Sequence, residues 1–92
     1  MAIFAIISQP SPNGEKLAGA IKAAFDDAVY DVGNGVWLVS GRGPAREISD
    51  RIGITNGENG SGIILELASY FGRANPAIWT WIQANWETSA VD

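Results

Sequence analysis

Two segments, residues 2–8 and 36–40, carry apolar side chains at both odd and even positions. Successive side chains of an extended strand point to opposite faces, so such a segment is apolar on both faces and is typical of a strand covered on both sides. The apolar positions are Ile3, Phe4, Ala5, Ile6 and Ile7 in the first segment and Val36, Trp37, Leu38 and Val39 in the second. The pattern therefore predicts two interior strands.

Two further strands are predicted at residues 29–32 and 62–70. The first is separated from the strand at 36–40 by a Gly-Asn-Gly turn, which is typical of a β-hairpin. The second places three large aliphatic residues on one face, which we expect to be core, and Glu66 on the other. A charge in mid-strand is a common protection of an edge strand, so this strand is predicted to lie at an edge.

Residues 14–27 have helical spacing. Leu17, Ile21 and Phe25 recur every four residues and form one apolar stripe. Asn13 is the expected N-cap. Two aspartates close the segment and oppose the helix dipole, which favours an early stop.

Two more helices are predicted at residues 44–52 and 76–87. The first begins with Pro44 and is followed by Gly53, a residue suited to a left-handed cap. The second follows Asn75, the expected N-cap, and has a proline at its first position.

The predicted order is strand, helix, strand, strand, helix, strand and a final helix. This order indicates a single α+β domain over residues 1–92, a ferredoxin-like βαββαβ sandwich with an additional C-terminal helix. In that arrangement the first and third strands lie in the middle of the sheet. Those are the two strands with apolar residues on both faces.

The two helices that connect the strands cover only one face of such a sheet, so the apolar residues of the other face must be buried by something else. Either the tryptophan-bearing C-terminal helix folds across it, or a second copy packs sheet against sheet, and both arrangements can combine. We favour the homodimer, because a two-fold dimer needs only one self-complementary patch. The expected interface residues are Trp37, Trp79, Trp81, Ile82 and Trp86.

The composition excludes several classes of catalytic and metal site. The chain has no cysteine and no histidine, which excludes thiolate metal sites, cysteine nucleophiles and Ser-His-Asp triads. A net charge of −4 argues against binding to a phosphate backbone, which needs clustered Lys and Arg. No segment is long enough to span a membrane, and the start is too short for a signal peptide. We expect a soluble, cytoplasmic protein.

The strand-to-helix turn Gly41-Arg42-Gly43, with Arg46 one helical turn later, is a candidate anion site, because free N–H groups at a helix start attract anions. The alternative is a tight turn with solvated arginines. The carboxylates lack Ca²⁺-loop spacing, so we expect no metal and no cofactor. Residues 55–62 are rich in Asn and Gly and fit either a ligand flap or, as we favour, a solvated connector.

Three stretches carry a resemblance to a known family: residues 3–8, the run from Val36–Val39 into residues 45–51, and residues 63–67. There the chain resembles the small ferredoxin-like proteins of the CRISPR-associated spacer-acquisition endoribonuclease family and their VapD-type relatives. It resembles the short proteins of the "SinR family" more closely still. The resemblance implies a dimeric ferredoxin-like fold. In the CRISPR family an aspartate ends the first strand and holds a metal, whereas here that strand ends Ile7-Ser8-Gln9-Pro10, without an acid.

The leading hypothesis is a non-enzymatic homodimeric interaction or scaffold domain, with a protein partner besides its own copy left open. The alternative is a metal-dependent nuclease related to the CRISPR-associated or VapD-type ribonucleases, using a carboxylate such as Asp31 or Glu66. A further alternative is a sensor of small anions or nucleotides that works through Arg42 and Arg46.

Overall fold

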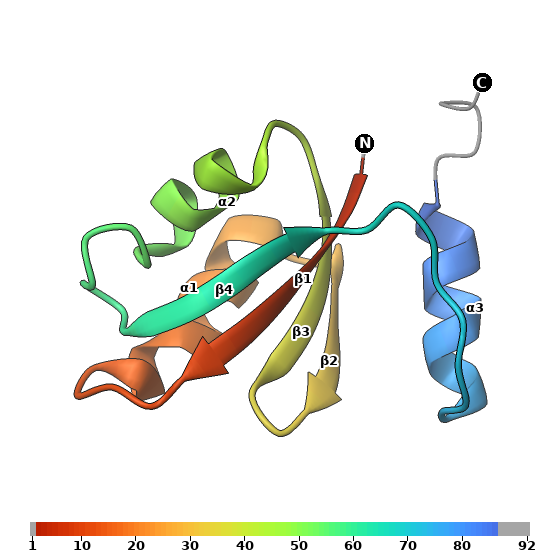
Figure 1. Cartoon of the computed structure of the whole chain (residues 1–92), viewed down its shortest axis with the longest axis horizontal. Coiled ribbons are helices and arrows are strands. Elements are labelled where there is room, and N and C mark those ends of the chain that lie inside the picture. The colour runs from red at the N-terminus through yellow and green to blue at the C-terminus, as the bar shows by residue number, and fades with distance from the viewer. Residues whose placement is uncertain (1, 87–92) are drawn as a thin grey trace.

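The computed structural model describes residues 2–86 of the 92-residue chain. Its sheet consists of β1 (Ala2–Gln9), β2 (Val29–Gly33), β3 (Val36–Gly41) and β4 (Ser61–Glu66). A 3₁₀ turn, η1 (Gly14–Lys16), leads into α1 (Leu17–Phe25), and the other helices are α2 (Ala45–Ile52) and α3 (Pro76–Asn85) (Figure 1). No helix in this part of the chain is long and apolar enough to cross a membrane.

The four strands form one antiparallel sheet with the order β2-β3-β1-β4. β1 and β3 lie in the middle, as their two apolar faces predict. Ile6 of β1 lies opposite Trp37 of β3 on one side and Ile64 of β4 on the other. The result is an α+β fold that is compatible with a ferredoxin-like arrangement, with β2 and β4 as its two edges.

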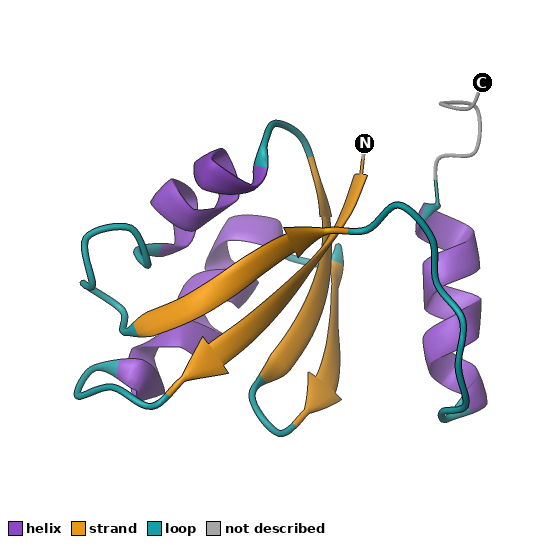
Figure 2. Ribbon diagram, in the orientation of Figure 1, coloured by secondary structure: helices purple, strands orange, loops and turns teal. Residues whose placement is uncertain are grey.

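The first sheet face is covered by α1 and α2 (Figure 2). The predicted stripe of α1 is buried against this face, and two isoleucines of α2 join it. The buried residues of this cluster are Phe4, Ile6, Leu17, Ile21, Phe25, Val39, Ile48 and Ile52. Arg51 ties the two helices together, because its guanidinium donates to the Ala24 carbonyl at 2.7 Å and lies 4.5 Å from the centre of the Phe25 ring.

The second sheet face is packed against α3, which contacts β1 and β2. Ile82 of α3 is buried between Ile3 and Leu38 of the sheet, and the tryptophans of the helix surround this centre. The chain thus supplies a cover for this face itself. This is the arrangement that the sequence left as the alternative to the favoured packing of a second copy.

Several element boundaries differ from the predictions. α1 ends at Phe25, earlier than the predicted 27, because Asp26 has left the helical region with φ 54°. Asn13 makes no side-chain cap at the start of η1, contrary to prediction. β4 ends at Glu66, although the strand was predicted to reach 70. The predicted end of the last helix at 87 lies outside the described residues, and the helix ends at Asn85.

Pro44, predicted as the first residue of its helix, is extended with ψ 166° and precedes α2 as its N-cap, whereas the remaining predicted turns and caps are confirmed. The β2–β3 hairpin turns through Gly33, Asn34 and Gly35, all with positive φ, where Gly and Asn are tolerated best. Gly53 ends α2 in the left-handed conformation. The Asn75 side chain caps α3 by accepting from the Ala77 N–H at 2.9 Å.

Candidate functional site

α3 leaves part of its sheet face uncovered. A helix is about 10 Å across with its side chains, whereas four strands spaced by about 4.8 Å make a wider sheet, so one helix covers about half of it. Ile3 and Leu38 lie under α3, and β1 and β4 run away from it toward their far end (Figure 1). At that end Ile7 pairs with Val36 on one side and with Ile63 on the other, so the three form an apolar row.

The exposed aliphatic side chains on this sheet face lie on β4. Ile63 is 46% exposed and Leu65 is 47% exposed, and their partners on β1 are Ile7 and Ala5, which face the α3 side. Ile64, on the opposite face, packs against the α1–α2 core instead. The sequence assigned the face of Ile63, Leu65 and Leu67 to the core, and this was wrong for the first two, because α3 does not extend over β4.

The outer edge of β4 presents unpaired backbone groups. The Leu67 N–H donates to the Ile3 carbonyl at 2.9 Å, and hydrogen-bonded pairs alternate with non-bonded pairs in an antiparallel ladder. Leu65 and Ile63 therefore bond to β1, and the N–H and C=O groups of Gly62, Ile64 and Glu66 point away from it. Because no second strand among residues 2–86 pairs with β4, these groups form an open edge. We call Gly62–Glu66 with its two half-exposed side chains the β4 edge.

The other edge of the sheet has an irregular register that β4 does not have, although each of the two edge strands carries one charged residue. The register of β2 is interrupted between Asp31 and Gly33, and the Asp31 carboxylate accepts the Gly33 N–H at 2.8 Å. A bulge and a charge on an edge strand both discourage pairing with a further strand. β4 has a regular register, no proline and no lysine, and Glu66 is its single charged residue.

The predicted interface tryptophans pack within the chain. Trp81 lies against Tyr30 at 6.1 Å between ring centres, and Tyr70 stands between Trp79 at 6.0 Å and Trp86 at 5.0 Å. Trp37 lies on the other sheet face, beside the α1–α2 core, and Ile82 is buried. These side chains thus pack within the chain, and their part in a dimer contact stays a prediction.

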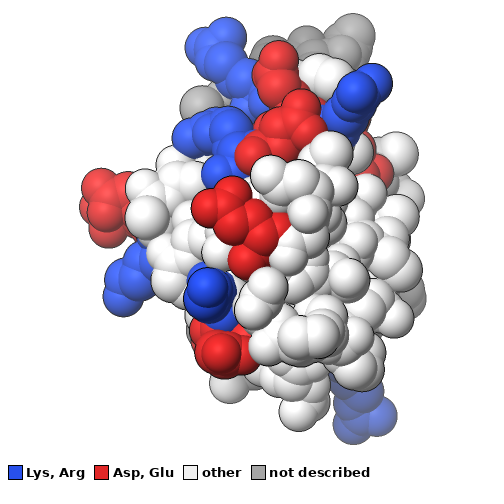
Figure 3. Space-filling model, turned by 90° about the vertical axis from the view of Figure 1, so that its left-hand side faces the viewer, with Lys and Arg blue, Asp and Glu red and all other residues white. Residues whose placement is uncertain are grey.

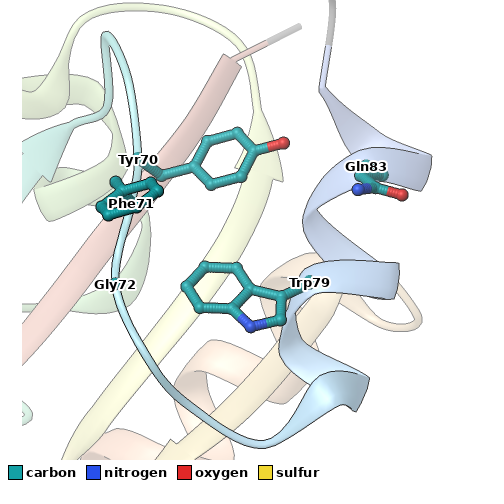
Figure 4. Close-up of a pocket in the computed structure, with 5 residues that line it drawn as sticks. All are labelled: Tyr70, Phe71, Gly72, Trp79 and Gln83. Carbon is teal, nitrogen blue, oxygen red and sulfur yellow. The ribbon is translucent and has the colours of Figure 1, made fainter.

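An aromatic pocket lies between α3 and the linker that leads to it. The pocket measures about 200 Å³ and is lined by Tyr70, Phe71, Gly72, Trp79 and Gln83. Figure 4 shows Tyr70 and Trp79 pointing toward one another from the linker and the helix. Phe71 is fully exposed, and sequence reasoning missed it because a single aromatic residue in a linker gives no periodic signal.

At the candidate anion site, the chain's own carboxylate occupies the helix start. The Glu47 side chain fills the space beside Gly43 that a Cβ would take, at the third helical position of α2. A carboxylate there interacts favourably with the helix dipole, so an external anion would have to displace it. Gly41 is buried, and Arg42 and Arg46 are exposed. The anion site stays a prediction.

The carboxylates singled out for metal chemistry lie apart. Asp31 is on β2 and Glu66 is on β4, which are opposite edges of the sheet. Among residues 2–86, no three acidic side chains come together as metal ligands. Asp26, Asp27 and Asp31 line a pocket of about 380 Å³ together with Lys22 and Trp37.

The Asn/Gly-rich connector before β4 is hydrogen bonded to α2. The Asn59 amide donates to the Ile52 carbonyl at 2.8 Å and so satisfies the end of α2, and the Thr55 hydroxyl donates to Asp50 at 2.5 Å. The connector also touches the loop after β1, where Ser61 N–H donates to the Ser11 hydroxyl at 3.1 Å. These bonds hold the start of β4 in place.

Charged side chains are unevenly spread over the surface. In the view of Figure 3, Lys, Arg, Asp and Glu gather toward the left and top, and the right-hand part of the visible surface carries little charge.

No protein-family model, curated protein or solved structure matches the chain.

Proposed function

We propose that this chain is a non-enzymatic interaction domain that forms a homodimer through the β4 edge. The observation that carries the proposal is the half exposure of Ile63 and Leu65 on an edge strand whose outer backbone is unpaired. Exposed aliphatic side chains beside an open sheet edge are a surface on which further chains associate.

We also infer that the domain is of the ferredoxin-like type. Each crossing helix connects two strands that have one antiparallel strand between them: α1 joins β1 to β2 around β3, and α2 joins β3 to β4 around β1. This is the split βαβ arrangement, used twice. It leaves β4 as an edge strand, so the fold itself explains why that surface is open.

A second copy is the partner that this surface fits best. Its centre is apolar and its single carboxylate lies at one end, so the surface has no charge pattern that calls for an oppositely charged partner. A two-fold contact also requires only one complementary patch, which each copy then supplies to the other. The net charge of −4 argues against a nucleic acid in this place.

The proposal is tested by the solution mass from light scattering over a wide concentration range. We expect the mass to rise from 9.8 kDa toward twice that value. Leu65→Lys is expected to weaken association roughly tenfold or more, because a lysine on an edge strand opposes pairing and places a charge in the apolar contact.

The matched control is Val32→Lys. Val32 is 42% exposed and lies on β2, the opposite edge of the sheet, so the same change there leaves the association constant as in the wild type. A mass that stays at 9.8 kDa at every concentration would contradict the proposal. So would an association equally weakened by both substitutions.

A further inference from the structure

We propose that β4 pairs antiparallel with β4 of a second copy about a two-fold axis through Ile64, so that one sheet continues across both copies. This inference rests on the proposed self-association and specifies its contact, residue by residue. Addition of a strand to an open edge is a recurrent mode of recognition, in which main-chain hydrogen bonds hold the partners and side chains set the register.

The open backbone groups restrict the possible registers. Gly62, Ile64 and Glu66 point outward, and each can donate one hydrogen bond and accept another only from outward-pointing residues of the facing strand. Even-numbered residues must therefore face even-numbered residues. A two-fold axis can pass through a residue of the strand, and each choice of residue gives a different set of opposed side chains.

Charge separates these registers. An axis through Glu66 would place two carboxylates directly opposite one another, which is destabilising. An axis through Ile64 places Glu66 opposite Gly62 of the second copy, where no side chain stands in its way. It also centres the pairing on the strand, so that all three outward-pointing residues find partners.

The same register matches the exposed side chains. With the axis at Ile64, Ile63 of one copy lies opposite Leu65 of the other, on the face where both are half exposed. These are non-hydrogen-bonded pairs, in which the facing side chains are closest, about 4.5 Å apart at Cα. Both aliphatic pairs would thereby lose exposure and extend the apolar row of Ile7 and Val36 across the axis.

Cysteine pairing tests this register directly, because the chain has no cysteine of its own. Ile63→Cys and Leu65→Cys are made in separate chains, one carrying a mass tag, and the mixture is oxidised at a concentration where the dimer is populated. Non-hydrogen-bonded partners in antiparallel strands lie within disulfide reach. Random pairing of equal amounts of the two chains gives twice as much mixed product as either homodimer. We expect the mixed disulfide to exceed either homodimeric disulfide by far more than this twofold ratio, and Val32→Cys to form no comparable product with either chain.

A dominant Ile63→Cys homodimer would place the axis at 63 and overturn the register. A dimeric wild type whose cysteine variants form no disulfide would overturn strand pairing altogether, and the proposed function would stand. A wild type that is monomeric at every concentration would instead contradict the proposed function itself.

A second pair of variants tests the hydrogen bonds. Glu66→Pro removes an outward N–H that β1 does not use, whereas Glu66→Gln removes the charge and keeps the N–H. We expect proline to weaken association roughly tenfold or more and glutamine to leave it near the wild-type value. Equal association of both variants would overturn the pairing of β4 with β4.

Discussion

At the scale of single residues, side chains from within the chain interact with both ends of α2. Glu47 is the clearest case, since its carboxylate stands beside Gly43 where a bound anion was expected. Asn59 acts similarly at the other end of α2, where its amide donates to the last-turn carbonyl of Ile52. Both ends of this short helix are thus stabilised from within the chain.

Gly43→Ala tests the placement of Glu47. Gly43 has φ 92°, which is strained for any residue with a Cβ, and that Cβ would also meet the Glu47 carboxylate. We expect a loss of about 1–3 kcal/mol in the free energy of unfolding, measured by urea denaturation.

The matched control is the same substitution in a Glu47→Ala background. In that background the strain of a positive φ at residue 43 remains, but the Glu47 carboxylate no longer occupies the space of the new Cβ. Alanine at 43 is therefore expected to lower the free energy of unfolding by less than it does in the wild type. An equal cost in both backgrounds would mean that Glu47 does not lie over the turn.

At the scale of elements, α3 decides which part of the sheet stays exposed. Its buried face centres on Ile82, which is 3% exposed and packs between Ile3 and Leu38. The aromatic residues around it enlarge the contact, with Trp81 on Tyr30 and Trp79 on Tyr70. The helix is therefore part of the fold and does not stand free for a partner.

Ile82→Ala measures this contribution. Truncating a buried isoleucine is expected to cost about 2–5 kcal/mol of unfolding free energy, from lost burial and from the cavity left behind. Ala84→Ser, at an exposed position of the same helix, is the control and is expected to change it by less than about 0.5 kcal/mol. A loss for Ile82→Ala as small as that of the control would show that α3 is not packed on the sheet.

At the scale of the whole molecule, local signals predicted the element order but could not decide how the second sheet face is covered. The two apolar faces of β1 and β3 predicted their central position, and Gly53 and Asn75 predicted the ends of helices, because these signals lie within a few residues of one another. The sequence shows that the second sheet face is apolar and must be covered. Whether the same chain covers it depends on contacts between residues that are far apart in the sequence.

The β4 edge shows the same limit. Ile63 and Leu65 alternate with their neighbours as core residues do, so periodicity assigned them to the interior. Their exposure follows from the reach of α3 and from the sheet order, neither of which a local pattern encodes. The unpaired groups at Gly62, Ile64 and Glu66 are likewise a property of the assembled sheet.

Residue-resolved amide hydrogen exchange at low and high protein concentration tests the central claim, self-association by pairing of the β4 edge. Ile63, Leu65 and Leu67 donate toward β1, so they are expected to exchange slowly at both concentrations. Gly62, Ile64 and Glu66 are expected to exchange quickly when dilute and to become protected when concentrated, because the second copy then accepts their hydrogen bonds. Exchange at these three amides that stays equally fast at both concentrations would contradict the account.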